Sequence, residues 1–153
     1  MKLHEALSER KEVTQRIRRL EQRLESGARV PEGNSAPEKY DDLRADLTGA
    51  LDRLRELNVQ INLTNVSAQV DGTGETITQA IARRDMLKEE LRILQAVAGS
   101  ASGGRSYGGE RIKYVSTMDI AALQAEIDRK SKEWRELDTK LQTANFKVDL
   151  AAT

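Results

Sequence analysis

The sequence predicts a mainly all-α protein built from four long helices. Ala, Glu, Lys, Leu and Arg make up 74 of the 153 residues, close to the half-of-chain share that is typical of long or coiled helices. Only five residues are aromatic, whereas sandwiches and barrels need strands rich in β-branched and aromatic residues. In four segments the apolar residues recur at alternating spacings of 3 and 4, which is the heptad seam of packed helices. We therefore expect an elongated antiparallel bundle or coiled coil that forms one domain over residues 1–153.

The first two helices are predicted at about residues 2–27 and 38–67. Gly27 is expected to end the first one in a left-handed conformation, which glycine adopts at little cost. Pro31 and Pro37, with glycine and polar residues between them, predict a loop. Because this connection is short, the two helices should lie antiparallel as a hairpin.

The last two helices are predicted at about residues 76–98 and 117–148. Thr76 is expected to cap the first of them through its hydroxyl group. Ser116, followed three residues later by Asp119, resembles the capping box that starts a helix. Both helices carry the same alternating apolar spacing as the first pair.

A Gly/Ser-rich stretch at residues 99–109 separates the last two helices and is expected to be a mobile loop. Residues 111–115 alternate polar and apolar side chains and predict one short β segment. Residues 68–70 are its nearest partner within the chain, and pairing between subunits is the alternative.

Charge and composition exclude several classes of protein. The 25 basic and 25 acidic residues cancel, and the one short basic run, at Arg16, Arg18, Arg19 and Arg23, is interrupted by acids, so no nucleic-acid partner is expected. No apolar run is long enough to span a bilayer, and the charged start does not resemble a signal peptide. The chain has no cysteine, which fits a reducing compartment. We therefore expect a soluble, cytoplasmic protein without a membrane partner.

Catalytic and metal-binding motifs are sparse. His4 is the sole histidine, no Glu-x-x-His pair of the di-iron bundles occurs, and Gly72-Thr-Gly74 lacks the third glycine of a dinucleotide-binding loop. We therefore expect no catalytic residue, no cofactor and no metal site, and a protein that is not an enzyme.

Polar residues at seam positions mark the candidate site. Asn58, Asn62 and Asn65 follow one another at helical spacing although Asn is a poor helix former, and Arg10 and Arg84 occupy seam positions that need an acidic partner. Lys130 does so too, with Glu133 or Asp128 as candidate partners. An antiparallel arrangement brings many of these residues to one end of the bundle. The predicted polar cluster comprises Glu5, Arg10, Asn58, Asn62, Asn65, Arg84, Asp85 and Asn145.

Two interpretations of this cluster remain open. It forms either a hydrogen-bond network that fixes register and partner choice, as single seam asparagines do, or a pocket for a small ligand or nucleotide that uses Arg83, Arg84, Asn62 and Asn65. Only 38% of the residues are hydrophobic, and four long stripes are hard to bury within one monomer. We therefore expect a homo-oligomer that acts as a structural or interaction module, with the ligand-binding protein as the alternative.

Several stretches together resemble the septicolysin-like family of small bacterial helical proteins. They are Met1-Lys-Leu3, Glu5-Ala-Leu7 with Arg10, Ile61-Asn-Leu-Thr-Asn65, Ala82-Arg-Arg-Asp85, Ile112-Lys-Tyr-Val-Ser-Thr117, and Glu136-Leu-Asp-Thr139 with Gln142 and Ala144-Asn145. The resemblance implies a helical domain of unknown function and supplies no catalytic residue. The family name implies a pore-forming cytolysin as a third alternative, against which the missing export signal and membrane segment argue.

Overall fold

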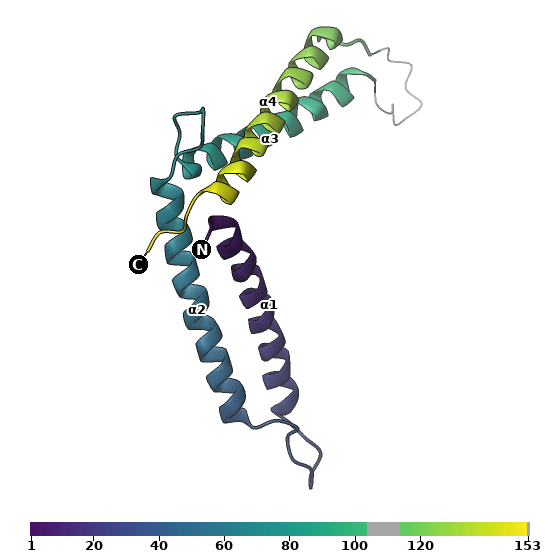
Figure 1. Cartoon of the computed structure of the whole chain (residues 1–153). Helices are drawn as coiled ribbons and strands as arrows, with labels where there is room; N and C mark the ends of the chain where they lie inside the picture. Colours follow the sequence, from purple (N-terminus) through teal and green to yellow (C-terminus); the bar gives the residue numbers. More distant parts are fainter. Residues whose placement is uncertain (104–113, 153) are drawn as a thin grey trace. The chain divides into compact units, whose positions relative to one another are not determined.

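The computed structural model describes residues 1–103 and 114–152, and in this part of the chain it contains four α-helices and no extended strand (Figure 1). The all-helical class is therefore confirmed. The helices are α1 (Leu3–Gly27), α2 (Tyr40–Ser67), α3 (Ile77–Ala101) and α4 (Ile120–Lys147). Each lies within three residues of its predicted bounds, because the heptad spacing, prolines and glycines that delimit it are local signals.

The described residues divide into two compact units. The first unit consists of Met1–Ala68 together with the chain from Asn145 onward, and the second unit consists of Gln69–Ala144. A single helical domain over residues 1–153 stays a prediction.

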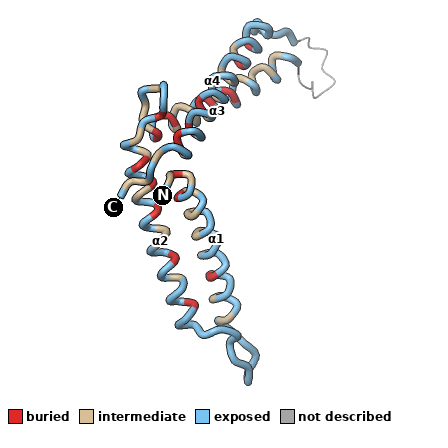
Figure 2. Tube along the Cα trace, viewed as in Figure 1, coloured by how far each residue is buried: buried red, intermediate tan, exposed pale blue. Residues whose placement is uncertain are grey.

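In the first unit, α1 and α2 form an antiparallel hairpin. Glu9 pairs with Arg53 and Arg16 with Asp46, so the residue number rises along one helix as it falls along the other. Leu20, with its neighbours from α2, forms a buried cluster near the loop of the hairpin. Buried residues recur along the facing sides of both helices (Figure 2).

In the second unit, α3 and α4 also run antiparallel. Arg83 lies within 3.4 Å of Glu133, and Glu90 lies 2.9 Å from Lys130, which is the same inverse register. Leu91 of α3 packs with Leu123 and Ile127 of α4 in a buried cluster.

Thr76 caps α3 as predicted. Its hydroxyl oxygen accepts a hydrogen bond from the backbone N–H of Gln79 at 3.3 Å, and the Gln79 side chain accepts one from the Thr76 N–H at 2.9 Å. This reciprocal pair is a capping box with Gln in place of Glu.

The predicted capping box at Ser116 is wrong. The helix begins at Ile120, and the Asp119 carboxylate accepts a hydrogen bond from the Ala122 N–H at 3.0 Å. Ser116 instead bonds to Met118. Asp is itself a strong N-cap, and here it caps from the position before the helix rather than from inside it.

Two glycines behave differently from the prediction. Gly27 is the last residue of α1 and is not left-handed, and the C-cap residue Ala28 that follows it is right-handed, with φ of −70°. Helix α3 continues through Gly99 to Ala101, so part of the predicted loop is helical. A left-handed glycine follows instead at Gly103, with φ of +80°. Glycine costs a helix only about 1 kcal/mol, which the flanking residues of both helices offset.

The predicted β segment at 111–115 is not shown. Its first three residues lie outside the described residues, and Tyr114 and Val115 are not in a strand. The isolated bridges in the described part of the chain join Lys2 to Asp149 and Gln69 to Thr76. The rest of the predicted loop at 99–109, beyond Gly103, also lies outside the described residues.

Candidate functional site

The predicted polar cluster is distributed over both units. Six of its members belong to the first unit, namely Glu5, Arg10, Asn58, Asn62, Asn65 and Asn145. The other two, Arg84 and Asp85, belong to the second unit. Their convergence at one end of the molecule stays a prediction.

Two of the asparagines are outside the seam. Asn58 and Asn62 are exposed, whereas Asn65 and Asn145 are half-buried. The buried side of α2 consists of Leu57, Ile61 and Thr64 at this end, so the seam runs through these residues instead. The exposed amides are therefore available to a partner rather than committed to the core of the hairpin.

The two charged members in the first unit have separate surroundings. The Glu5 carboxylate accepts a hydrogen bond from the Lys2 backbone N–H at 2.6 Å and so caps the start of α1. Arg10 makes no ion pair with any described residue. Among the described residues, no hydrogen bond joins Glu5 or Arg10 to the asparagines of α2.

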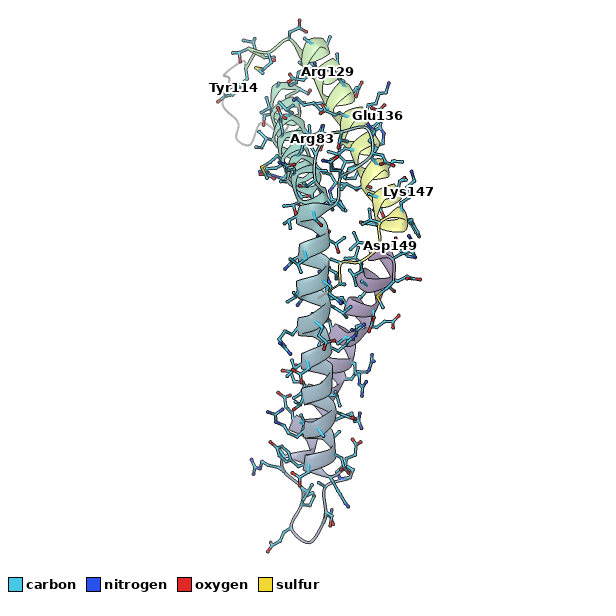
Figure 3. The ribbon with its side chains drawn as sticks, turned by 60° about the vertical axis from the view of Figure 1, so that its left-hand side comes forward. Arg83, Tyr114, Arg129, Glu136, Lys147 and Asp149 are labelled. Atoms are coloured by element: carbon cyan, nitrogen blue, oxygen red, sulfur yellow. The ribbon has the colours of Figure 1, made fainter. Side chains whose placement is uncertain are left out.

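The arginines of the second unit hold its helices together. Arg84 bonds Asp85 at 2.9 Å and Asp138 of α4 at 3.2 Å. Arg83, labelled in Figure 3, pairs with Glu75 at 2.9 Å and reaches Glu133 at 3.4 Å. Each guanidinium thus contacts two acids. Both arginines are therefore engaged in structural contacts within the unit.

Lys130 forms an ion pair with a different acid from those predicted. Its ammonium group lies 2.9 Å from Glu90 of α3, rather than against Glu133 or Asp128. The need for a partner is confirmed, because the Lys130 side chain is only 18% exposed. The identity of the partner depends on the register between α3 and α4, which spacing within one helix does not specify.

The chain ends of the first unit are joined by backbone hydrogen bonds. The Leu3 N–H donates to the Val148 carbonyl at 3.0 Å, and the Leu150 N–H donates to the Met1 carbonyl at 2.9 Å. The Lys2 ammonium lies 2.8 Å from Asp149 (labelled in Figure 3), and its hydrogen bond lowers the pKa of that carboxyl group. The segment after α4 is thus held against the start of α1.

Thr64 anchors the same segment to α2. It is 1% exposed and is the one buried polar residue in the described part of the chain. Its hydroxyl donates to the Gln60 carbonyl at 2.8 Å and accepts from the Ala151 N–H at 2.9 Å. Both bonding capacities of a buried hydroxyl are therefore used, as its desolvation requires.

A strong ion pair fixes the register of the α1–α2 hairpin. Arg53 donates two hydrogen bonds to the Glu9 carboxylate, at 2.7 and 2.9 Å. These bonds lower the pKa of Glu9. Bidentate pairs of this kind specify geometry as well as energy.

The outer side of α2 carries an apolar surface that the sequence analysis missed. Val59, Leu63 and Val66 are 46%, 45% and 58% exposed, at spacings of 4 and 3. At 100° per residue they share an arc of about 60°, roughly opposite the buried side of the helix. Asn58 and Asn62 follow one edge of this arc. We call these five residues the α2 outer patch.

One signal in the sequence marks this patch. Residues 57–70 contain no charged side chain, although 33% of the chain is charged. This is the longest uncharged run in the sequence. Because solvated helix faces are normally charged, a neutral run around a helix indicates that more than one of its sides is used for packing.

His4 has structural surroundings. Its ring lies 4.3 Å from that of Phe146, centroid to centroid, and its Nδ1 is shielded from solvent and has no hydrogen-bond partner among the described residues. In the described residues, no three acidic or histidine side chains are placed to hold a metal ion. None of the described helices combines the length and apolar character needed to cross a bilayer.

Comparison with known proteins identifies the family. The sequence profile of the family of unknown function DUF6847 matches residues 10–150. A crystal structure of a functionally unknown conserved protein from Corynebacterium diphtheriae is similar, with 32% identity, 99% of each chain covered and a TM-score of 0.87. No curated protein matches the chain.

These findings correct the resemblance drawn from the sequence. The matching profile and the similar structure do not support a septicolysin-like family. The cytolysin alternative depended on that family name and is withdrawn with it. Since the profile spans nearly the whole sequence, the chain belongs to the family of unknown function DUF6847.

Proposed function

We propose that the protein is a self-associating interaction module in which two copies meet through the α2 outer patch. The observation that carries this proposal is the exposure of Val59, Leu63 and Val66 on the side of α2 away from its core. Leu51, which is 45% exposed, lies along the edge of the same side. Apolar side chains gathered on an exposed helix face gain free energy when a partner covers them.

The charge pattern favours a second copy of the chain as the partner. Interface centres are depleted of charged residues, and α2 has none from Leu57 to Ser67. A two-fold interface places the same patch on both sides, so a neutral patch meets its copy without repulsion between like charges. The amides of Asn58 and Asn62 each donate and accept hydrogen bonds, and can therefore pair with themselves across the axis.

The size of the patch indicates a reversible complex. Covering a half-exposed Val or Leu contributes about 1 kcal/mol, and the loss of translational and rotational freedom on association costs at least about 4 kcal/mol. The free energy gained by covering the apolar side chains of two copies therefore exceeds this cost only slightly. We therefore expect a monomer–dimer equilibrium that depends on protein concentration.

Light scattering on a size-exclusion column, over about two decades of protein concentration, tests the proposal. The wild-type mass should rise toward that of a dimer with concentration. Leu63→Lys places a charge in the patch at a position that is already exposed, so the variant should fold and remain a monomer.

Ile93→Lys is the matched control. Ile93 of α3 is 47% exposed, so the substitution makes the same chemical change on a helix of the second unit, and this variant should dimerise like the wild type. A wild-type protein that stays monomeric at the highest concentration contradicts the proposal. So does a dimer that Leu63→Lys leaves intact.

A further inference from the structure

The second unit contains an open cavity on one side of α3 that the proposed self-association does not use. Its volume is about 470 Å³, within the roughly 300–1,000 Å³ of small-molecule sites. Trp134 of α4 and Leu91 of α3 contribute its apolar surface, and Lys88 and Gln95 are among its polar residues. The cavity therefore combines an aromatic surface with a few polar groups, as ligand sites commonly do.

Trp134 provides a rigid base for the cavity. It is half-buried and packs against the cluster formed by Leu91, Leu123 and Ile127. A flat indole held in this way offers a stacking surface to another ring. Its Nε1 is shielded from solvent and has no hydrogen-bond acceptor among the described residues.

The charges around the cavity favour an anion. Arg92 donates hydrogen bonds of 2.6 and 2.8 Å to Glu89, and this contact lowers the pKa of Glu89. Asp85 is 2.9 Å from Arg84. Both acids therefore contact an arginine, and Arg84 is shared with Asp138, whereas Lys88 makes no ion pair with any described residue. The two acidic and two basic side chains that line the cavity cancel, so what favours an anion is Lys88, the one charged group of this lining that has no ion-pair partner among the described residues.

We propose that this cavity binds a small aromatic carboxylate, with the ring against Trp134 and the carboxylate toward Lys88. The inference is independent of the proposed self-association, because it uses a different unit and different residues. A cation that stacked on the indole would find no unpaired acid to add to the attraction of the ring, because both acids of the cavity are engaged, and it would lie near the positive charge of Lys88.

Three probes with the same ring separate these possibilities: phenylacetate, 2-phenylethanol and 2-phenylethylamine. Trp134 is the sole tryptophan, so its fluorescence reports directly on the cavity. Phenylacetate should change the emission saturably, with a dissociation constant on the order of millimolar for a ligand of this size. The neutral alcohol should bind more weakly, and the amine most weakly.

Lys88→Gln tests the charge. Since exposed ion pairs are weak, the variant should bind phenylacetate about threefold more weakly, with no change for 2-phenylethanol. Lys132→Gln is the matched control, because it removes an exposed lysine of α4 that does not line the cavity, and it should bind as the wild type does.

Several results overturn the proposal. They are the absence of saturable binding, equal binding of all three probes, a preference for the amine, and an unchanged affinity for phenylacetate in Lys88→Gln. Both lysines are on the surface of a helix, so a folding defect does not account for any of these outcomes.

Discussion

At the scale of single residues, Thr64 connects two parts of the first unit. Its hydroxyl bonds back to α2 at Gln60 and forward to Ala151 in the segment after α4. The sequence alone does not reveal this role, because Thr64 lies among asparagines at the end of a helix. Its role is visible only in the structure, where the segment after α4 is hydrogen-bonded to the Thr64 hydroxyl.

Replacing Thr64 with valine should destabilise the protein. Valine keeps the shape but removes the hydroxyl, which leaves the Ala151 N–H without its acceptor, and a buried unsatisfied donor costs about 1–3 kcal/mol. Urea unfolding followed by circular dichroism measures this loss. Thr64→Ser keeps the hydroxyl and should retain more stability than Thr64→Val. A valine variant as stable as the wild type contradicts the role assigned to this hydroxyl.

Charged residues show how far sequence reasoning extends at this scale. A half-buried Arg84 or Lys130 needs an acid, and the sequence supports that expectation without the structure. The contact with Asp85 involves the next residue in the chain, so it is the kind of partner that the sequence indicates. Asp138 and Glu90 were missed as partners because they come from the facing helix.

At the scale of the helices, local signals account for most of the boundaries. Thr76 and Gln79 form the capping box that their spacing indicates, and Pro31 and Pro37 lie in the loop between α1 and α2. Errors arose where two capping groups compete. Asp119 caps α4 although Ser116 precedes it, because Asp is itself a strong N-cap and the Ser116 hydroxyl bonds to Met118 instead.

Gly49 in the middle of α2 provides a test of helix propensity. A Cβ atom added there meets no other atom within 4 Å, and alanine is better than glycine in a helix by about 1 kcal/mol. Gly49→Ala should therefore raise the free energy of unfolding by about that amount, measured by urea denaturation.

Gly74→Ala is the opposite case for the same measurement. Gly74 has φ of +72°, a left-handed conformation that costs alanine about 1 kcal/mol. This variant should lose stability even though its Cβ atom also meets no neighbour. A loss of stability in Gly49→Ala would show that the glycine in α2 has a packing role that the structure does not account for.

The candidate site was only partly predictable from the helices. The spacing of Asn58 and Asn62 correctly indicated a polar stripe, but this stripe lies beside the seam of buried residues rather than within it. The buried positions Leu57, Ile61 and Thr64 lie directly before or after exposed residues of the stripe or patch. A periodicity of 3 and 4 fits both sides of this uncharged end of α2, so spacing alone does not tell the core side from the outer side there.

At the scale of the whole molecule, association of two copies is the central claim. The sequence led to this expectation through the low apolar content and the long stripes, without locating the contact. We propose the α2 outer patch as its location, because the patch combines exposed Val59, Leu63 and Val66 with a neutral edge.

Cross-linking of single-cysteine variants tests this location most directly, since the chain has no cysteine of its own. A short bismaleimide should join two copies of Asn62→Cys, whose thiols lie at the edge of the patch. Arg44→Cys is the control, because position 44 is on the same side of α2 but five helical turns away, or about 27 Å. The proposed contact predicts dimers for Asn62→Cys well in excess of those for Arg44→Cys, whereas equal yields at the two positions, or none at position 62, would contradict it.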